Sequence, residues 1–205
     1  MTRDEKLGRL QPLLREVLEV LGEDPDREGL RRTPERWADA LLTYVGGMQQ
    51  AAGDHLGVIF HLDEDDFPAL SDDMVIVDNI EFVSTCEHHM APIRGVVHIA
   101  YIPDPAQRIV TGLSKLSRVV SVFARRLQLQ ERMTQQIAQA IDAHLHPQGV
   151  ITVVQAVHYC MVQRGVEQRS SATTTTARRG VFLEKPALEA RFQEYLRLRL
   201  DTTKF

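Results

Sequence analysis

Two stretches with strand character are interrupted by a compact group of reactive side chains. Residues 73–86 (DMVIVDNIEFVSTC) and 95–103 (GVVHIAYIP) are rich in the β-branched and aromatic residues that favour strands. Between them lies CEHHMAP, which holds a cysteine, a carboxylate and two adjacent histidines and ends in a proline. Because the interruption is short, we expect the two strands to form a hairpin-like unit with the Cys/His cluster at its turn.

The rest of the chain alternates between helical and strand patterns. Leucines and valines at helical spacing in residues 7–21 predict an amphipathic helix, and a second helix is expected over residues 31–45. After the hairpin, the pattern predicts two helices, two strands and a C-terminal helix, over residues 114–127, 131–145, 150–162, 170–183 and 187–200. This order of elements is typical of an α+β fold.

Net charge and hydropathy argue against nucleic acid and membranes as partners of this chain. The net charge of −4 argues against nucleic acid as the main partner. No apolar run approaches the ~20 residues of a membrane span, and the N-terminus has no apolar stretch of signal-peptide type. We therefore expect a cytoplasmic protein with no membrane partner. Residues 61–73 are acidic, whereas residues 164–180 are basic and could hold an anionic small molecule.

The two cysteines of the chain both have histidine neighbours. Cys86 belongs to CEHH and Cys160 to HYC, and in a cytoplasmic chain metal binding or catalysis is a better expectation than a disulfide. If the strand continues through Cys160, alternation places His158 and Cys160 on one face about 7 Å apart. Cys86, His89 and Cys160 would then form a donor set suited to zinc, with a fourth position for water. His88 and His158 would remain to move protons.

The residues alone leave other interpretations open. A cysteine nucleophile with a histidine base needs the same residue types. A lone cysteine is most often a small buried hydrophobic residue, and a lone strand histidine usually has no ligand. Nothing local joins CEHH to HYC, so a shared metal site remains a hypothesis at this point.

Polar residues at two predicted helix starts are candidates for binding an anionic ligand. Residues 112–115 (GLSK) open a helix whose free N–H groups would favour a phosphate, with Lys115 and Arg118 adding charge. An ordinary solvated helix start explains them equally well. Arg164 could serve a ligand or a surface salt bridge. Glu131 could accept two hydrogen bonds from a guanine edge, although a glutamate in a first helical turn needs no special role.

Six segments, taken in order, resemble those of the GTP cyclohydrolase I family. They are STCEHHMAPIRG, HIAYIP, GLSKLSRVV, QLQERMTQQI, AVHYCMVQRGV and SATTTTARRGVF. RRTPERW is similar to the family's N-terminal TPxR signature. The resemblance runs from about residue 20 to residue 184, and the segments are specific jointly, since no single one would suffice.

The resemblance implies an α+β tunnelling fold (T-fold). That fold has an antiparallel four-stranded sheet with two inserted helices, preceded by N-terminal helices. We expect four parts: a helical region (1–50), an acidic connection (51–73), a catalytic T-fold domain (74–185) and a C-terminal helix and tail (186–205). The resemblance also implies a homo-oligomer, a decamer of two stacked pentamers with active sites shared between neighbouring subunits.

The implied activity is conversion of GTP and water to 7,8-dihydroneopterin triphosphate and formate, the first step of tetrahydrofolate or pterin biosynthesis. Zinc-bound water would attack C8 of the purine. Carried over residue by residue, the family's zinc ligands match Cys86, His89 and Cys160, which would hold one zinc ion per subunit. The general acid matches His158, a second catalytic histidine matches His88, and the guanine-holding pair matches Gln130 and Glu131. The triphosphate and ribose contacts match Ser114, Lys115, Arg118 and Arg164, with Ser114 also counted as catalytic and with Arg36 supplied by another subunit.

Two other interpretations fit the residues less well. Another enzyme of the same superfamily, a pterin synthase or a deazaguanine reductase, would use three histidines on zinc or a cysteine nucleophile without zinc. The combination of CEHH and HYC argues against both. A zinc-stabilised interaction module without catalysis would close the metal with four ligands, and it would leave GLSK, QER and Arg164 unexplained.

Overall fold

The structure, a computed structural model, describes the backbone of residues 1–63, 65 and 72–202. Its contacts divide the chain into two compact units, Met1–Gly46 and Gly47–Phe205. The first unit consists of α1 (Arg3–Val20) and α2 (Thr33–Tyr44), so both expected N-terminal helices are confirmed. Leu14 and Leu18 are the buried members of the leucine stripe on α1.

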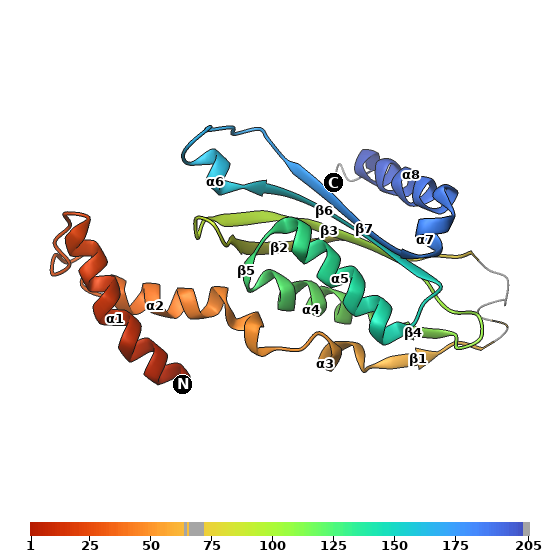
Figure 1. Ribbon diagram of the computed structural model, residues 1–205, viewed down its shortest axis with the longest axis horizontal. Coiled ribbons are helices and arrows are strands. Elements are labelled where there is room, and N and C mark those ends of the chain that lie inside the picture. Colours follow the sequence, from red (N-terminus) through yellow and green to blue (C-terminus); the bar gives the residue numbers. More distant parts are fainter. Residues whose placement is uncertain (64, 66–71, 203–205) are drawn as a thin grey trace. The chain divides into compact units, whose positions relative to one another are not determined.

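The second unit is built on a five-stranded sheet with the order β5-β2-β3-β6-β7 (Figure 1). Its four long strands are antiparallel neighbours: β2 (Val75–Cys86), β3 (Pro92–Ile102), β6 (Gly149–His158) and β7 (Thr173–Gly180). The expected hairpin and the four-stranded antiparallel sheet are therefore confirmed. The two-residue strand β5 (Leu127–Gln128) adds a parallel pairing beside the end of β2. A separate small sheet pairs β1 (Ile59–His61) with β4 (Ile109–Thr111).

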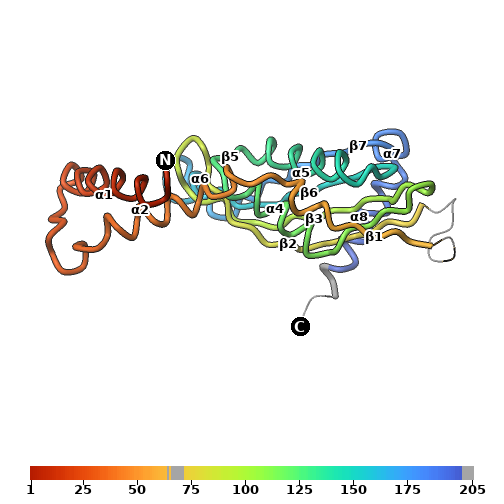
Figure 2. The backbone as a smooth tube through the Cα atoms, turned by 90° about the horizontal axis from the view of Figure 1, so that it is seen from below, coloured from red at the N-terminus to blue at the C-terminus, as the bar shows by residue number. Residues whose placement is uncertain are grey.

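Helices cover both faces of this sheet. α4 (Leu113–Ala124) and α5 (Gln130–Leu145) pack on one face, where Leu116, Ile137 and Val154 belong to the main core. α7 (Val181–Glu184) and α8 (Pro186–Thr202) cover the other face, where Phe182 and Phe192 form a second core with Ile151. Figure 2 shows α5 and α8 on opposite sides of the strands. In the part of the chain that the structure describes, no helix has the length and apolar character that crossing a membrane requires.

Two segments differ from the sequence-based expectation. Residues 51–73, for which an acidic connection without regular structure was expected from the sequence, contain the short helix α3 (Gly53–Leu56) and β1. Residues 64 and 66–71 of the acidic stretch lie outside the described residues. The strand expected over 150–162 ends at His158, and the chain continues as α6 (Tyr159–Val162). The ladder ends there because His158 already pairs with the second residue of β3, and the residue before it is Pro92, which has no N–H to donate.

A glycine allows close contact between β3 and β6 near their common end. Gly95 pairs with Ala156, and a Cβ atom at Gly95 would lie 2.0 Å from the carbonyl oxygen of Gln155. Such a distance is far inside van der Waals contact, so only glycine fits here without moving a strand. The close approach therefore fixes the spacing between the hairpin and the strand that ends in His158.

Candidate active site

Three metal-binding side chains come together at one end of the sheet. The ligand atoms of Cys86, His89 and Cys160 all lie within 4.8 Å of one another. Cys86 is the buried last residue of β2, His89 is exposed in the turn that follows, and Cys160 is partly buried on α6. The break in β6 invalidates the argument from strand alternation, yet α6 still carries Cys160 to the other two residues.

Backbone hydrogen bonds hold the turn that carries two of these residues. The Cys86 N–H donates to the Ala91 carbonyl over 2.8 Å, and the Met90 N–H donates to the Cys86 carbonyl over 2.9 Å. On the other side, the Glu87 N–H donates to the carbonyl of Gln128, which lies in β5, over 3.1 Å. The turn is thus fixed to β5 as well as to its own hairpin.

The donor set fits a zinc ion. Burial raises the pKa of the Cys160 thiol, and the neighbouring Cys86 raises it further by repulsion and a hydrogen bond. Two thiols this close resist ionisation unless a cation compensates their charge, and a divalent metal supplies that charge. Two sulfurs and one imidazole nitrogen are ligands that zinc prefers, and three protein ligands are typical of catalytic zinc sites.

Arg164 lies directly beside this cluster. Its Nη1 donates to Nε2 of His89 over 2.7 Å. A neutral imidazole that binds a metal through one nitrogen carries hydrogen on the other, so it has no lone pair left to accept from an arginine. Metal binding by His89 is therefore incompatible with this hydrogen bond, and it would release the guanidinium group next to the site.

His158 lies outside the metal-binding group and faces α5. Its Nε2 is 2.7 Å from Oε1 of Gln130, which is only 1% exposed. The Nε2 of Gln130 faces three oxygens, the carbonyls of Val154 and Thr173 and the hydroxyl of Thr175, at 3.0 to 3.1 Å. These acceptors fix the amide, so its oxygen must accept and His158 carries its hydrogen on Nε2.

The environment of His158 favours the neutral form of its ring. Burial lowers the pKa of His158, and the negative charge of the nearby Glu131 opposes this effect without reversing it. Glu131 itself is exposed in the first turn of α5. The N–H groups of this first turn have no acceptor within the helix, so they are available to a ligand along with the Glu131 carboxylate.

Sequence reasoning missed one contact of the turn. Glu87, which had no role assigned from the sequence, accepts two hydrogen bonds from Arg132, at 2.5 and 3.1 Å. The two residues are far apart in sequence, and only the juxtaposition of β5 with the end of β2 brings them together. The other candidate in the turn, His88, is exposed and its ring lies edge-on to that of His89, with centroids 6.2 Å apart.

The candidate phosphate-binding residues lie at the opposite end of this unit. α4 begins just after Thr111, whose N–H donates to the Tyr101 hydroxyl, and Tyr101 pairs with Val75 at the start of β2. The metal-binding group lies at the end of β2, and Figure 1 shows β4 and α6 at opposite ends of the sheet. The length of α4 puts Ser114 and Lys115 on the order of 20 Å from Cys86 in the same chain, with Arg118 one turn nearer. Arg36 lies on α2, in the N-terminal unit.

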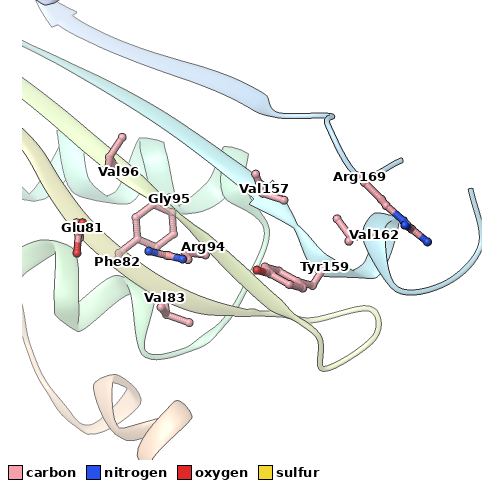
Figure 3. Close-up of a pocket in the computed structure, with 10 residues that line it drawn as sticks. All are labelled: Glu81, Phe82, Val83, Arg94, Gly95, Val96, Val157, Tyr159, Val162 and Arg169. Atoms are coloured by element: carbon pink, nitrogen blue, oxygen red, sulfur yellow. The ribbon is translucent and has the colours of Figure 1, made fainter. Parts of the chain in front are cut away.

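A separate hollow of about 640 Å³ lies near the site residues without including them (Figure 3). Among its described lining residues are Arg94, Tyr159 and Val157. Val157 precedes His158 on β6, and neighbouring strand residues point to opposite faces. Since His158 faces α5, the hollow belongs to the other face of the sheet.

The fold and this site define a class of protein: an α+β enzyme candidate with a Cys–His–Cys metal-binding group and an adjacent anchored histidine. The family model for GTP cyclohydrolase I matches residues 10–197. The chain belongs to the GTP cyclohydrolase I family, and the expected T-fold is thereby confirmed.

Curated relatives agree with the family model. The chain is 47% identical to GTP cyclohydrolase 1 of Dictyostelium discoideum, over 92% of this chain and 77% of that protein. It is 46% identical to the protein of the same name from Deinococcus radiodurans (90% and 82%), and 48% identical to that from Streptomyces griseus (91% and 88%). Among solved structures, the archaeosine synthase QueF-Like in the apo form aligns with 54% of this chain and 96% of its own, at 17% identity and a TM-score of 0.41. A TM-score this low identifies neither fold nor function.

Proposed function

We propose that this protein hydrolyses GTP to 7,8-dihydroneopterin triphosphate and formate. Membership of the GTP cyclohydrolase I family supports the reaction. The single structural observation that carries it is the convergence of Cys86, His89 and Cys160. His158, two residues before Cys160, is held in place by its hydrogen bond to Gln130. The product would serve tetrahydrofolate or pterin biosynthesis, and a cytoplasmic location is part of the same proposal.

The metal would be one zinc ion per chain, held by Cys86, His89 and Cys160. When bound, zinc supplies a Lewis acid that lowers the pKa of water to near 7 and so provides a nucleophile for C8 of the purine. Arg164, displaced from His89, would then be free to contact the ribose or the triphosphate. His88, exposed beside His89, is the second candidate for proton transfer.

His158 would act as the general acid. Because its Nε2 hydrogen is engaged by Gln130, the nitrogen that gains and loses a proton is Nδ1. Because its pKa is lowered, the protonated ring is a stronger acid and would donate its proton more readily to the purine imidazole as that ring opens. Gln130 has both ends of its amide in use, so its contribution to guanine binding would come from its main-chain N–H. The Glu131 carboxylate would accept from the N1–H and amino group of guanine.

We further propose that active sites are shared between subunits of a homodecamer. Ser114 and Lys115 are too far from Cys86 of their own chain to hold the triphosphate of a GTP whose base lies at that cluster. A second copy supplying Ser114, Lys115 and Arg118 would complete the site, and Arg36 would come from another copy. Among the described residues, Val75–Ser84 of β2 pair only with β3 and β7 pairs only with β6, which leaves two sheet edges for neighbouring copies.

The test is an assay of the zinc-loaded protein with GTP. We expect release of formate, together with a product that becomes a fluorescent pterin after oxidation. Removal of zinc with a chelator should abolish both signals, and added zinc should restore them. A protein that binds zinc with the wild-type ligands but never turns over GTP would contradict the proposed function and favour a structural metal module.

A further inference from the structure

The ion pair of Glu87 with Arg132 joins two segments that carry different parts of the proposed site. Glu87 lies between Cys86 and the two histidines of the turn, and Arg132 follows Glu131 in the first turn of α5. Nη1 and Nη2 of Arg132 each donate to one carboxylate oxygen of Glu87, at 2.5 and 3.1 Å. Two parallel hydrogen bonds fix the relative orientation of both groups, not only their distance.

Stability alone is a poor explanation for this pair. The side chain of Glu87 is 27% exposed and that of Arg132 is 45% exposed, so solvent screens this ion pair and reduces its contribution to folding. The helix dipole also disfavours a cation in the first turn of a helix. At the position of Arg132, an acidic residue would stabilise the helix more than an arginine does.

The two segments need a fixed separation for the reaction. The turn carries Cys86 and His89, whereas the first turn of α5 carries Gln130, which orients His158, and Glu131, the proposed guanine contact. If the turn moved relative to α5, the guanine base would be displaced from the metal. In reactions that depend on proximity, a displacement of about 1 Å can reduce the rate by about a hundredfold.

We propose that Glu87 and Arg132 form a positioning pair that holds the metal-binding turn in register with the base-binding start of α5. This inference rests on the proposed function. Neither residue touches the reacting atoms; the pair acts through Cys86, His89 and Glu131. The two-bonded fork is the property that matters, so a lysine at position 132 cannot replace the arginine.

The test compares Glu87→Gln, Arg132→Gln and Arg132→Lys with the wild type in the zinc-loaded protein. We expect kcat for formate release to fall roughly tenfold to a hundredfold in each variant, with zinc content unchanged and KM for GTP within about threefold. The double variant Glu87→Gln with Arg132→Gln should be no slower than either single variant, because the first change already breaks the pair. Full activity in Arg132→Lys, or multiplicative losses in the double variant, would overturn the proposal.

A matched control comes from the pair Arg178–Glu189 on another part of the unit, where Nε and Nη2 of the arginine also donate to both carboxylate oxygens, at 2.6 and 2.5 Å. Glu189→Gln should leave kcat unchanged. A readout independent of turnover is the visible absorption of the cobalt-substituted protein, which should change in Arg132→Lys and not in Glu189→Gln. If the wild type fails to release formate, the proposed function is contradicted, but an altered cobalt spectrum in Arg132→Lys would still show that the pair positions the metal-binding turn. If the spectrum of Arg132→Lys is also unaltered, the inference is contradicted as well.

Discussion

The Nε2–H of His158 donates to Oε1 of Gln130 over 2.7 Å, and the amide of Gln130 cannot turn around. Its nitrogen is held by the carbonyls of Val154 and Thr173 and by the hydroxyl of Thr175. This arrangement fixes both the orientation of the imidazole and the nitrogen that carries its hydrogen. A buried amide of this kind would prepare His158 for the proposed proton transfer without contacting the substrate through its own side chain.

Replacement of Gln130 by methionine should therefore impair catalysis more than binding. We expect kcat to fall by about tenfold or more, since His158 loses its fixed orientation. The free energy of unfolding should also fall by about 1–3 kcal/mol, because buried carbonyls lose a donor. Gln148→Met is the control, since its amide donates to Pro103 at the other end of β6. Wild-type kcat in Gln130→Met would show that the anchor is not needed.

His158 and Cys160 are close in sequence but should respond differently to substitution. His158→Ala should reduce kcat at least about a hundredfold and retain the wild-type zinc content, because His158 is not one of the converging ligands. Cys160→Ala should lose zinc and activity together. Metal content measured by atomic absorption separates the two cases. Loss of zinc in His158→Ala would show that the ligand set is wrong.

Sharing of sites between subunits predicts complementation. Lys115→Ala and His158→Ala should each be nearly inactive as pure oligomers. When the two are dissociated together and reassembled in equal amounts, about one quarter of the sites should receive both intact residues if each site draws them from different chains. Activity should rise accordingly. No recovery in mixed oligomers, verified as mixed by mass spectrometry, would place both residues in a site within one chain.

Acid should destabilise the fold through a histidine remote from the metal group. His98 is 7% exposed and its Nδ1 accepts the N–H of Asn79 over 3.1 Å. Burial lowers the pKa of His98, with the charge of Asp78 opposing the shift. The unfolded chain therefore binds a proton at higher pH than the folded chain does, so stability is present above the unfolded pKa of about 6.5 and is lost as the pH falls below it.

Urea unfolding between about pH 8 and about pH 5 measures this effect. His98→Gln should give a shallower decline in the free energy of unfolding, since glutamine can still accept from Asn79 but does not titrate. His61→Gln, at an exposed histidine, should leave the slope as in the wild type. His158 has a lowered pKa with the same sign, so part of the decline should persist in His98→Gln. A slope identical to the wild type would rule out His98 as a contributor.

The β-branched patterns of the sequence were sufficient to predict the four long strands, and the family resemblance supplied their arrangement as one antiparallel sheet. The convergence of Cys86, His89 and Cys160 was a hypothesis from the residues alone and was implied by the family resemblance. The argument that placed His158 and Cys160 on one face of a continuous strand was wrong. Strand alternation beyond His158 was assumed, whereas the partner strand begins with Pro92 and the ladder stops. The end of a strand depends on its neighbour in space, and a local pattern does not contain that information.

Side-chain contacts between segments that are distant in the sequence could not be predicted from the sequence patterns. Gln130 was expected to hold guanine, and its burial against β6 and β7 becomes apparent only when α5 is packed on the sheet. The pairing of Glu87 with Arg132 depends on β5, a strand of two residues that no periodicity could indicate. The division into residues 1–50, 51–73, 74–185 and 186–205 stays a prediction.

The absence of a side chain at Gly95 has a consequence for how this protein can vary. A methyl group there would collide with β6 and force apart the strand that begins after the cysteine–histidine turn and the strand that ends in His158. A change of one carbon atom, several residues from the proposed reacting groups, would thus shift His158, the proposed proton donor, away from the Cys86–His89–Cys160 group. Natural variants at this position should consequently be depleted as strongly as variants of the catalytic residues, even though the position has no chemistry of its own.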